Sequence, residues 1–168
     1  MPINEKRESN PNLGALIEGL SDAGVKFILV GGLASVVQGA PVTTMDVDIV
    51  HDQSEENVSR LFNFLKLVGA IYRRPDDRVI QPRKEDLAGK GHVLLTTRLG
   101  PLDVLATIEK GKDYKELIEH TIEIEFRGNF VRVLRLKEII VLKEGTKDPK
   151  DKQRLPILKE VLQQLEKK

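Results

Sequence analysis

Two aspartates interrupt a short apolar run whose other residues are typical of a buried β-strand. The run is MDVDIV, residues 45–50, and the acids are Asp46 and Asp48. Since side chains two positions apart on a strand point to the same face, the carboxylates are expected about 5–7 Å apart on one side of a sheet. Two negative charges that close repel one another and lose hydration when partly buried. A divalent cation would remove both penalties, because carboxylate oxygens are ligands that Mg²⁺ prefers.

An acid pair with this spacing also has a plain interpretation, in which a half-exposed strand simply turns both acids to water. For an isolated D-x-D that interpretation is the more frequent one, but further features favour a functional site here. Gly31 and Gly32 directly follow the apolar run VKFILV (25–30) and precede a short helix. Glycines let the backbone approach a phosphate, and a helix start offers free amides. Asp103, within GPLDVLATI, is a third acid in an apolar strand and a candidate third ligand.

Hydrophobic periodicity and turn residues predict alternating helices and strands along the chain. Strands are expected at 25–30, 45–51, 92–98, 102–108, 121–126 and 129–135. Helices are expected at 12–24, 33–39, 54–69, 112–119, 136–145 and 147–168, with Pro156 kinking or restarting the last one. The polar residues 73–91 are expected to form a long loop or a broken excursion. This order predicts an α/β or α+β domain with a mixed sheet flanked by helices, and with helices at its C-terminal end.

Length and composition indicate one domain with a sizeable core. The chain has 168 residues, 40% of them hydrophobic, and its 27 basic and 26 acidic residues nearly balance, which argues against disorder through excess like charge. The absence of cysteine excludes disulfides, thiol catalysis and zinc–thiolate sites. We expect residues 1–168 to form a single domain, with a catalytic α/β core at about 12–135 and a helical C-terminal segment at 136–168.

Localisation and charge distribution give weaker indications. The N-terminal sequence MPINEKRESN lacks the apolar core of a signal peptide, and no apolar stretch reaches the roughly 20 residues of a membrane span. A cytoplasmic protein without a membrane segment is therefore expected. Residues 132–168 hold 11 basic and 6 acidic residues. Such an end is typical either of a phosphate-binding surface or of a solvated helical face.

Taken together, the motifs resemble the polymerase-β-like nucleotidyltransferase superfamily. Its pattern is an apolar strand ending in GG or GS, then D-x-D, then a third acid on a later strand; the matching residues are Gly31, Gly32, Asp46, Asp48 and Asp103. The sequence is most similar to a minimal bacterial branch that includes the AbiEii-type toxin nucleotidyltransferases. There the first motif runs into a short helix ending in glycine, as in GGLASVVQG, and a later helix resembles LKEIIVLKEGTKDPKDKQRLPIL. The resemblance spans roughly residues 27–158.

The resemblance implies nucleotidyl transfer, in which a hydroxyl attacks the α-phosphate of a nucleoside triphosphate and pyrophosphate leaves. It implies two metal ions, Mg²⁺ or Mn²⁺, held by Asp46 and Asp48, with Asp103 binding one of them and accepting the proton of the attacking hydroxyl. The amides of Gly31 and Gly32 would bind the β- and γ-phosphates.

Further phosphate ligands are expected nearby. Lys143 is an isolated lysine on an apolar helix; the other candidates are Ser35 and Lys150. Each lysine also has an interpretation as a solvated or snorkelling side chain. Two positions depart from the pattern: Leu33 stands where many relatives have a hydroxyl residue, and Val42 stands where a basic residue is frequent.

Other polar residues are weaker candidates. His51 and His92 are expected to be structural rather than functional. The arginines of the polar excursion are either solvated or in contact with an acceptor; they are Arg73, Arg74, Arg78 and Arg83.

Three functions stay open at this point. The first is an active nucleotidyltransferase whose acceptor is RNA, a protein or a small molecule. The second is a weak or inactive module of the same fold that binds a nucleotide or an antitoxin-like partner chain, which Leu33 and Val42 favour. The third is a scaffold domain without a phosphate site. The three clustered acids favour the first.

Overall fold

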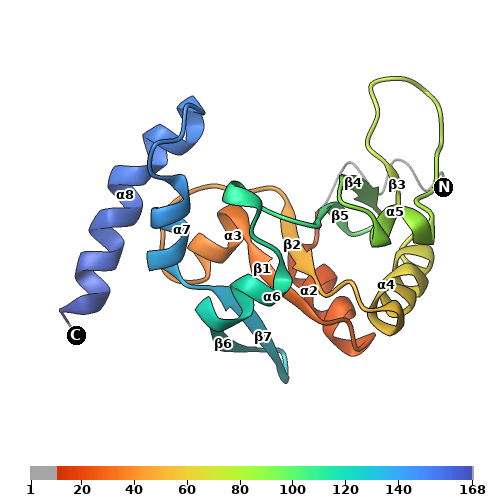
Figure 1. Cartoon of the computed structure of the whole chain (residues 1–168), viewed down its shortest axis with the longest axis horizontal. Coiled ribbons are helices and arrows are strands. Elements are labelled where there is room, and N and C mark those ends of the chain that lie inside the picture. The colour runs from red at the N-terminus through yellow and green to blue at the C-terminus, as the bar shows by residue number, and fades with distance from the viewer. Residues whose placement is uncertain (1–10, 168) are drawn as a thin grey trace.

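The computed structural model describes residues 11–167, and it has helices on a central sheet (Figure 1). The strands are β1 (Phe27–Val30), β2 (Val47–His51), β3 (Ile71–Tyr72), β4 (His92–Thr97), β5 (Gly100–Leu105), β6 (Thr121–Phe126) and β7 (Asn129–Leu134). The helices are α2 (Leu13–Asp22), α3 (Gly31–Val36), α4 (Glu55–Leu67), α5 (Lys84–Ala88), α6 (Tyr114–Leu117), α7 (Leu136–Lys143) and α8 (Pro149–Glu166). Short 3-10 turns cover Glu109–Gly111 and Ile118–His120.

The sheet has seven strands and is mixed, as the element order predicts. Its strand order is β3-β4-β5-β2-β1-β7-β6. Strand β2 runs parallel to β5 and β1 runs parallel to β7, whereas the other neighbours are antiparallel. The expected hairpins β4–β5 and β6–β7 are both present. The α/β fold with C-terminal helices is therefore confirmed.

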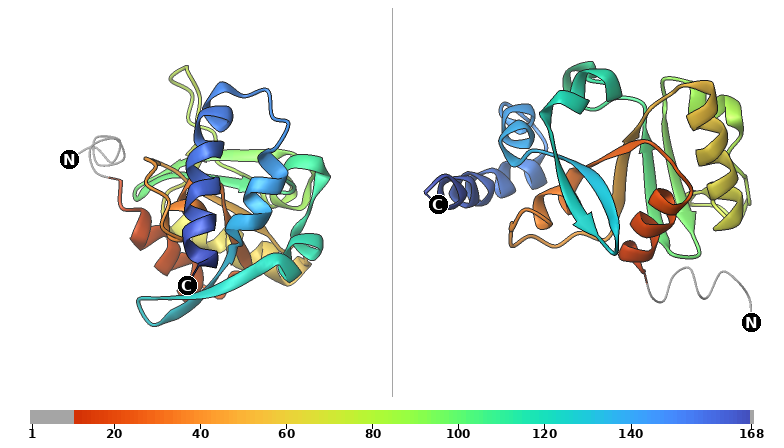
Figure 2. Two further views of the ribbon diagram at one scale, coloured as in Figure 1. Left: turned by 90° about the vertical axis from the view of Figure 1, so that its left-hand side faces the viewer. Right: turned by 90° about the horizontal axis from the view of Figure 1, so that it is seen from below.

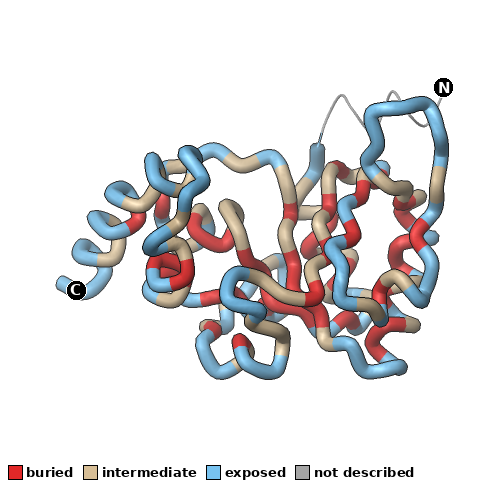
Figure 3. The backbone as a smooth tube through the Cα atoms, turned by 45° about the horizontal axis from the view of Figure 1, so that its top comes forward, coloured by how far each residue is buried: buried red, intermediate tan, exposed pale blue. Residues whose placement is uncertain are grey.

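Two amphipathic helices, α2 and α4, lie side by side against one face of the sheet (Figure 2). The side chain of Asn12 caps α2 by accepting from the Ala15 amide, and Ser54 caps α4 by accepting from the Asn57 amide. The helices approach closely at Gly19, where a Cβ would lie 2.7 Å from the Phe64 ring. Their apolar faces join the central strands in one core, which the tube in Figure 3 shows in red.

The C-terminal helices and the polar excursion occupy opposite ends of the molecule (Figure 1). Helix α8 packs on α7 and buries Leu158. It continues through Pro156 as one element, so the helix does not restart there, whereas the alternative of a kink at Pro156 stays a prediction. Proline at this position removes one backbone donor, but α8 is long enough to keep its other hydrogen bonds.

The remaining differences from the sequence prediction are local. The two-residue strand β3 was not predicted, because so short a run has no periodicity, and the excursion 73–91 contains the short helix α5. Helix α3 begins at the glycines themselves, and β2 begins at Val47, so Asp46 precedes the strand. Within residues 11–167, no helix combines the length and apolar character of a membrane span. The N-terminal segment 1–10, which is predicted to carry no signal peptide, lies outside the described residues.

Candidate active site

The pairing of β2 with β5 brings three acids together. Asp48 and Asp103 are directly opposite one another in the parallel register, and Asp46 lies two residues before Asp48. One carboxylate oxygen of each acid lies within 4.8 Å of those of the other two. By strand alternation, Asp48 points away from the side taken by Val47 and Ile49, which are fully buried. The sequence motif and the third acid therefore form one cluster on the more open side of the sheet.

The electrostatics of this cluster are unfavourable without a cation. Oδ1 of Asp48 is buried and has no hydrogen-bond partner. Burial raises the pKa of Asp48 to about 7, with further contributions from Asp103 and Asp46, and burial also raises the pKa of Asp103. An orphaned carboxylate oxygen among three converging acids fits a divalent cation, whose ligands would be these oxygens.

The two glycines pack closely against the acid cluster and its neighbours. Gly31 directly follows β1 with φ of 71°, and a Cβ added there would lie 2.1 Å from Oδ2 of Asp48. A Cβ on Gly32 would lie 3.0 Å from the Thr44 hydroxyl and 3.3 Å from the guanidinium of Arg154. With glycine at these two positions, the backbone can lie directly against the acid cluster and against Arg154 of α8.

A cavity of about 180 Å³ extends from the glycines to the C-terminal helices. Its polar lining combines three cationic side chains with two carboxylates and a hydroxyl; these residues are Ser35, Asp48, Lys143, Lys150, Asp151 and Arg154. The structure therefore brings Ser35, Lys143 and Lys150 to one cavity with Gly31 and Gly32, and their role as phosphate ligands stays a prediction. The cavity begins at Asp48, so cationic pocket and acid cluster are continuous.

Lys143 is held by two carboxylates within this cavity. Its ammonium donates to Glu109 and lies 3.2 Å from Oδ2 of Asp151. Burial alone would lower the pKa of Lys143, but Glu109 and Asp151 outweigh burial and raise it. The lysine is thus charged and ion-paired within the protein rather than solvated, and two carboxylates already offset its charge.

Arg154 is a cavity residue that the sequence reasoning missed. Its guanidinium donates to the carbonyl oxygen of Thr43 at 2.6 Å and lies beside Gly32. The missed signal is the spacing of Lys150, Arg154 and Leu158, which are four residues apart and all line the cavity.

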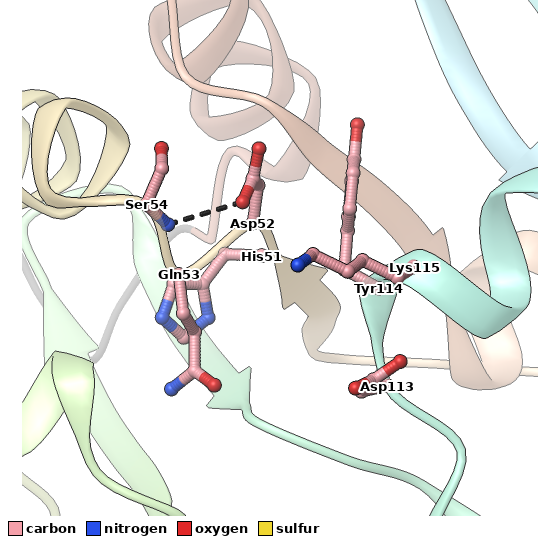
Figure 4. Close-up of a pocket in the computed structure, with 7 residues that line it drawn as sticks. All are labelled: His51, Asp52, Gln53, Ser54, Asp113, Tyr114 and Lys115. Carbon is pink, nitrogen blue, oxygen red and sulfur yellow. Dashed lines mark hydrogen bonds between the residues drawn. The ribbon is translucent and has the colours of Figure 1, made fainter.

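The histidines lie apart from the acid cluster. His51, at the far end of β2, is buried and its Nε2 donates to the carbonyl of Leu87 at 2.7 Å, while its Nδ1 has no partner. Burial lowers the pKa of His51, so the ring is neutral near pH 7. A separate hollow of about 300 Å³ lies here, with His51, Asp52 and Gln53 facing Asp113, Tyr114 and Lys115 (Figure 4). His92 is exposed at the start of β4.

Most arginines of the excursion are paired with acids of the protein itself. Arg74 contacts Asp76 at 2.7 Å, Arg83 contacts Asp86 at 3.4 Å, and Arg73 contacts Asp103. Their availability for an acceptor is reduced accordingly, and Arg73 instead belongs to the acid cluster.

No protein-family model matches the sequence, and no curated protein matches it either. Solved structures do match the fold. The lincosamide antibiotic adenylyltransferase LnuA, in its lincomycin-bound crystal structure, has a TM-score of 0.61 and 15% identity over 91% of this chain and 99% of that chain. The enzyme ANT(2″)-Ia in complex with adenylyl-2″-tobramycin has a TM-score of 0.55 and 15% identity over 89% of each chain.

A nucleotidyltransferase-like antigenic protein from Paracoccidioides brasiliensis has a TM-score of 0.53 and 16% identity over 86% of this chain and 72% of that chain. At such low identities the similarity establishes the fold and nothing finer. The chain has the fold of these nucleotidyltransferases, whereas its assignment to the AbiEii-type branch stays a prediction.

Proposed function

We propose that this protein is a nucleotidyltransferase that transfers a nucleoside monophosphate from a nucleoside triphosphate to an acceptor hydroxyl. The observation that carries the proposal is the continuity of two features: three converging acids just before β2, on β2 and on β5, and a cationic cavity that extends from the glycines and Asp48 to α8. Both features occur on a fold that the chain shares with known nucleotidyltransferases.

The acids have distinct roles in this proposal. Asp46, Asp48 and Asp103 would hold Mg²⁺ or Mn²⁺, which supplies charge neutralisation to the reacting phosphate. The acceptor oxygen forms a bond to the α-phosphorus while the bond from that phosphorus to the bridging oxygen breaks. Pyrophosphate leaves, and the hydroxyl proton passes to the carboxylate of Asp103.

The cavity side chains would hold the β- and γ-phosphates. Lys143 is charged and fixed, and Lys150 and Arg154 project from successive turns of α8. Gly31 and Gly32 line the same cavity, and their backbone amides would complete the phosphate contacts. Leu33 brings no hydroxyl, so in this proposal the cations of α7 and α8 supply phosphate contacts that relatives obtain from serine or threonine.

Binding of the triphosphate is the first test. We expect calorimetry with a nucleoside triphosphate and Mg²⁺ to show magnesium-dependent binding that Asp46→Ala abolishes. The exposed acid Asp77 makes no ion pair among the described residues, and Asp77→Ala is the matched control that should bind normally. Absence of magnesium-dependent binding in the unmodified protein would refute the proposal.

Transfer is the second test, and it separates an enzyme from a binding module. Incubation with each of the four labelled triphosphates and cell extract should leave label on one class of acceptor, resolved by size. RNA, protein and small-molecule hydroxyls are all candidates, and two of the similar structures are described with antibiotics. Binding without any transfer would favour the alternative function, a nucleotide- or partner-binding module of the toxin–antitoxin type.

A further inference from the structure

One basic side chain enters the acid cluster from the far side of the hairpin β4–β5. In the register of the sheet, Leu94 lies opposite Asp103, which lies opposite Asp48, and the amide of Arg73 donates to the carbonyl oxygen of Leu94 at 2.9 Å. Leu94, Asp103 and Asp48 therefore form one row across β4, β5 and β2, and Arg73, directly after β3, extends it. Strand pairing thus fixes the backbone position of Arg73 beside this row.

The side chain of Arg73 spans the strand between itself and the acid. Two strand spacings put its backbone about 10 Å from that of Asp103, which an extended arginine covers. Its Nη2 donates to Oδ1 of Asp103 and lies 3.3 Å from the carbonyl oxygen of Leu95. The arginine side chain is 37% exposed and that of Asp103 is 17% exposed, so the pair lies at the partly exposed margin of the cluster.

Arg73 is the counter-charge of this cluster in the absence of metal. Among the described residues, no other cationic side chain forms an ion pair with Asp46, Asp48 or Asp103. Burial raises the pKa of Asp103 and of Asp48, and the guanidinium of Arg73 acts in the opposite direction on both. The arginine thus partly supplies the stabilisation that a bound cation would supply.

A divalent cation and the guanidinium of Arg73 would compete for the carboxylate of Asp103. A cation held by all three acids would bind the carboxylate of Asp103, which already accepts from Arg73, and the guanidinium would repel that cation. We infer that Arg73 is a resident counter-ion of the metal site, which must release Asp103 before the three acids can bind a divalent cation. This inference rests on the proposed function and deepens it, because it makes metal binding weak until the negative charge of the triphosphate arrives.

Titration with MgCl₂ alone, without nucleotide, tests the inference directly. Arg73→Gln should bind Mg²⁺ about tenfold more tightly than the unmodified protein, since a unit positive charge next to the ion is removed. Arg73→Lys keeps the charge and should bind Mg²⁺ like the unmodified protein. Arg74→Gln is the matched control, because Arg74 pairs with Asp76 and not with the cluster, and the affinity of this variant for Mg²⁺ should be unchanged.

The outcomes separate this inference from the proposed function. If Arg73→Gln binds Mg²⁺ equally or more weakly, Arg73 does not compete with the metal and only the inference fails. If neither protein binds Mg²⁺, alone or with a triphosphate, the metal site and the proposed function fail together.

A second measurement uses the unmodified chain and does not depend on how well the variant folds. Arginine-selective ¹⁵N NMR should show the side-chain signals of Arg73 moving to those of an unpaired guanidinium as Mg²⁺ saturates the protein. The side chain of Arg78 serves as the internal reference. Signals of Arg73 that stay unchanged at saturation would overturn the inference.

Discussion

At the scale of single residues, Gly31 is where the turn after β1 and the acid cluster constrain each other. Its φ of 71° is unfavourable for other residues, and a Cβ there would overlap Oδ2 of Asp48. We expect Gly31→Ala to lower the free energy of unfolding by about 3 kcal/mol and to abolish metal binding. Gly128→Ala, with φ of 84° and no atom within 4 Å of the new Cβ, should cost only about 1 kcal/mol. If urea denaturation shows the same loss of unfolding free energy for both variants, the predicted clash between a Cβ at position 31 and Asp48 is contradicted.

Asp48 makes the stability of the metal-free protein depend on pH. Its folded pKa of about 7 is above the ordinary 3.8, so the folded state binds more protons between these values and stability falls as pH rises from about 4 to about 7. Asp48→Asn removes this fall in stability with rising pH, because asparagine does not titrate. In EDTA we expect the variant to be more stable than the unmodified protein by about 2 kcal/mol at pH 8, with the difference vanishing near pH 4. A difference independent of pH would show that Asp48 is not the titrating group.

At the scale of elements, α8 contributes one face to the cavity, through residues spaced four apart. Arg154→Gln should weaken triphosphate binding about tenfold, because it removes a charged phosphate contact, while leaving the affinity for Mg²⁺ alone unchanged. Lys152 lies on the exposed side of the same helix, and Lys152→Gln is expected to have little effect. Calorimetry with and without nucleotide measures both quantities. A loss of Mg²⁺ affinity in Arg154→Gln would mean that α8 also shapes the acid cluster.

The elements differ in how far the sequence predicts them, because some depend on neighbouring residues and others depend on contacts between distant segments of the chain. Alternation within 45–50 and the flanking glycines are local, so the sequence predicts the acids and the turn as parts of one site. The contact of Arg73 with Asp103 depends on the pairing of β3, β4 and β5, and a two-residue strand carries no readable period. Helix α8 was predicted as an element, but its face toward the cavity depends on packing against α7.

At the scale of the whole molecule, the candidate site joins segments that are far apart in the chain. The turn at Gly31, Asp48 of β2 and the cations of α7 and α8 line one cavity, and Asp48 joins that cavity to the acid cluster with Asp46 and Asp103. Loop closure over such distances costs conformational entropy, which the shared core must offset. A ligand that bridges these segments should therefore stabilise all of them at once.

Hydrogen exchange can separate the two halves of this site. We expect Mg²⁺ alone to slow amide exchange in β2 and β5, which carry the acids, and to leave α8 unchanged. A nucleoside triphosphate added with Mg²⁺ should also protect α8 and residues 31–35, because its phosphates would contact Lys150 and Arg154 across the cavity from Gly31. Asp48→Asn serves as the control, since weaker metal binding should reduce both effects together. Protection of β2 and β5 by the nucleotide complex without any change in α8 would place the triphosphate outside the cavity, and the cations of α8 would then belong to another surface.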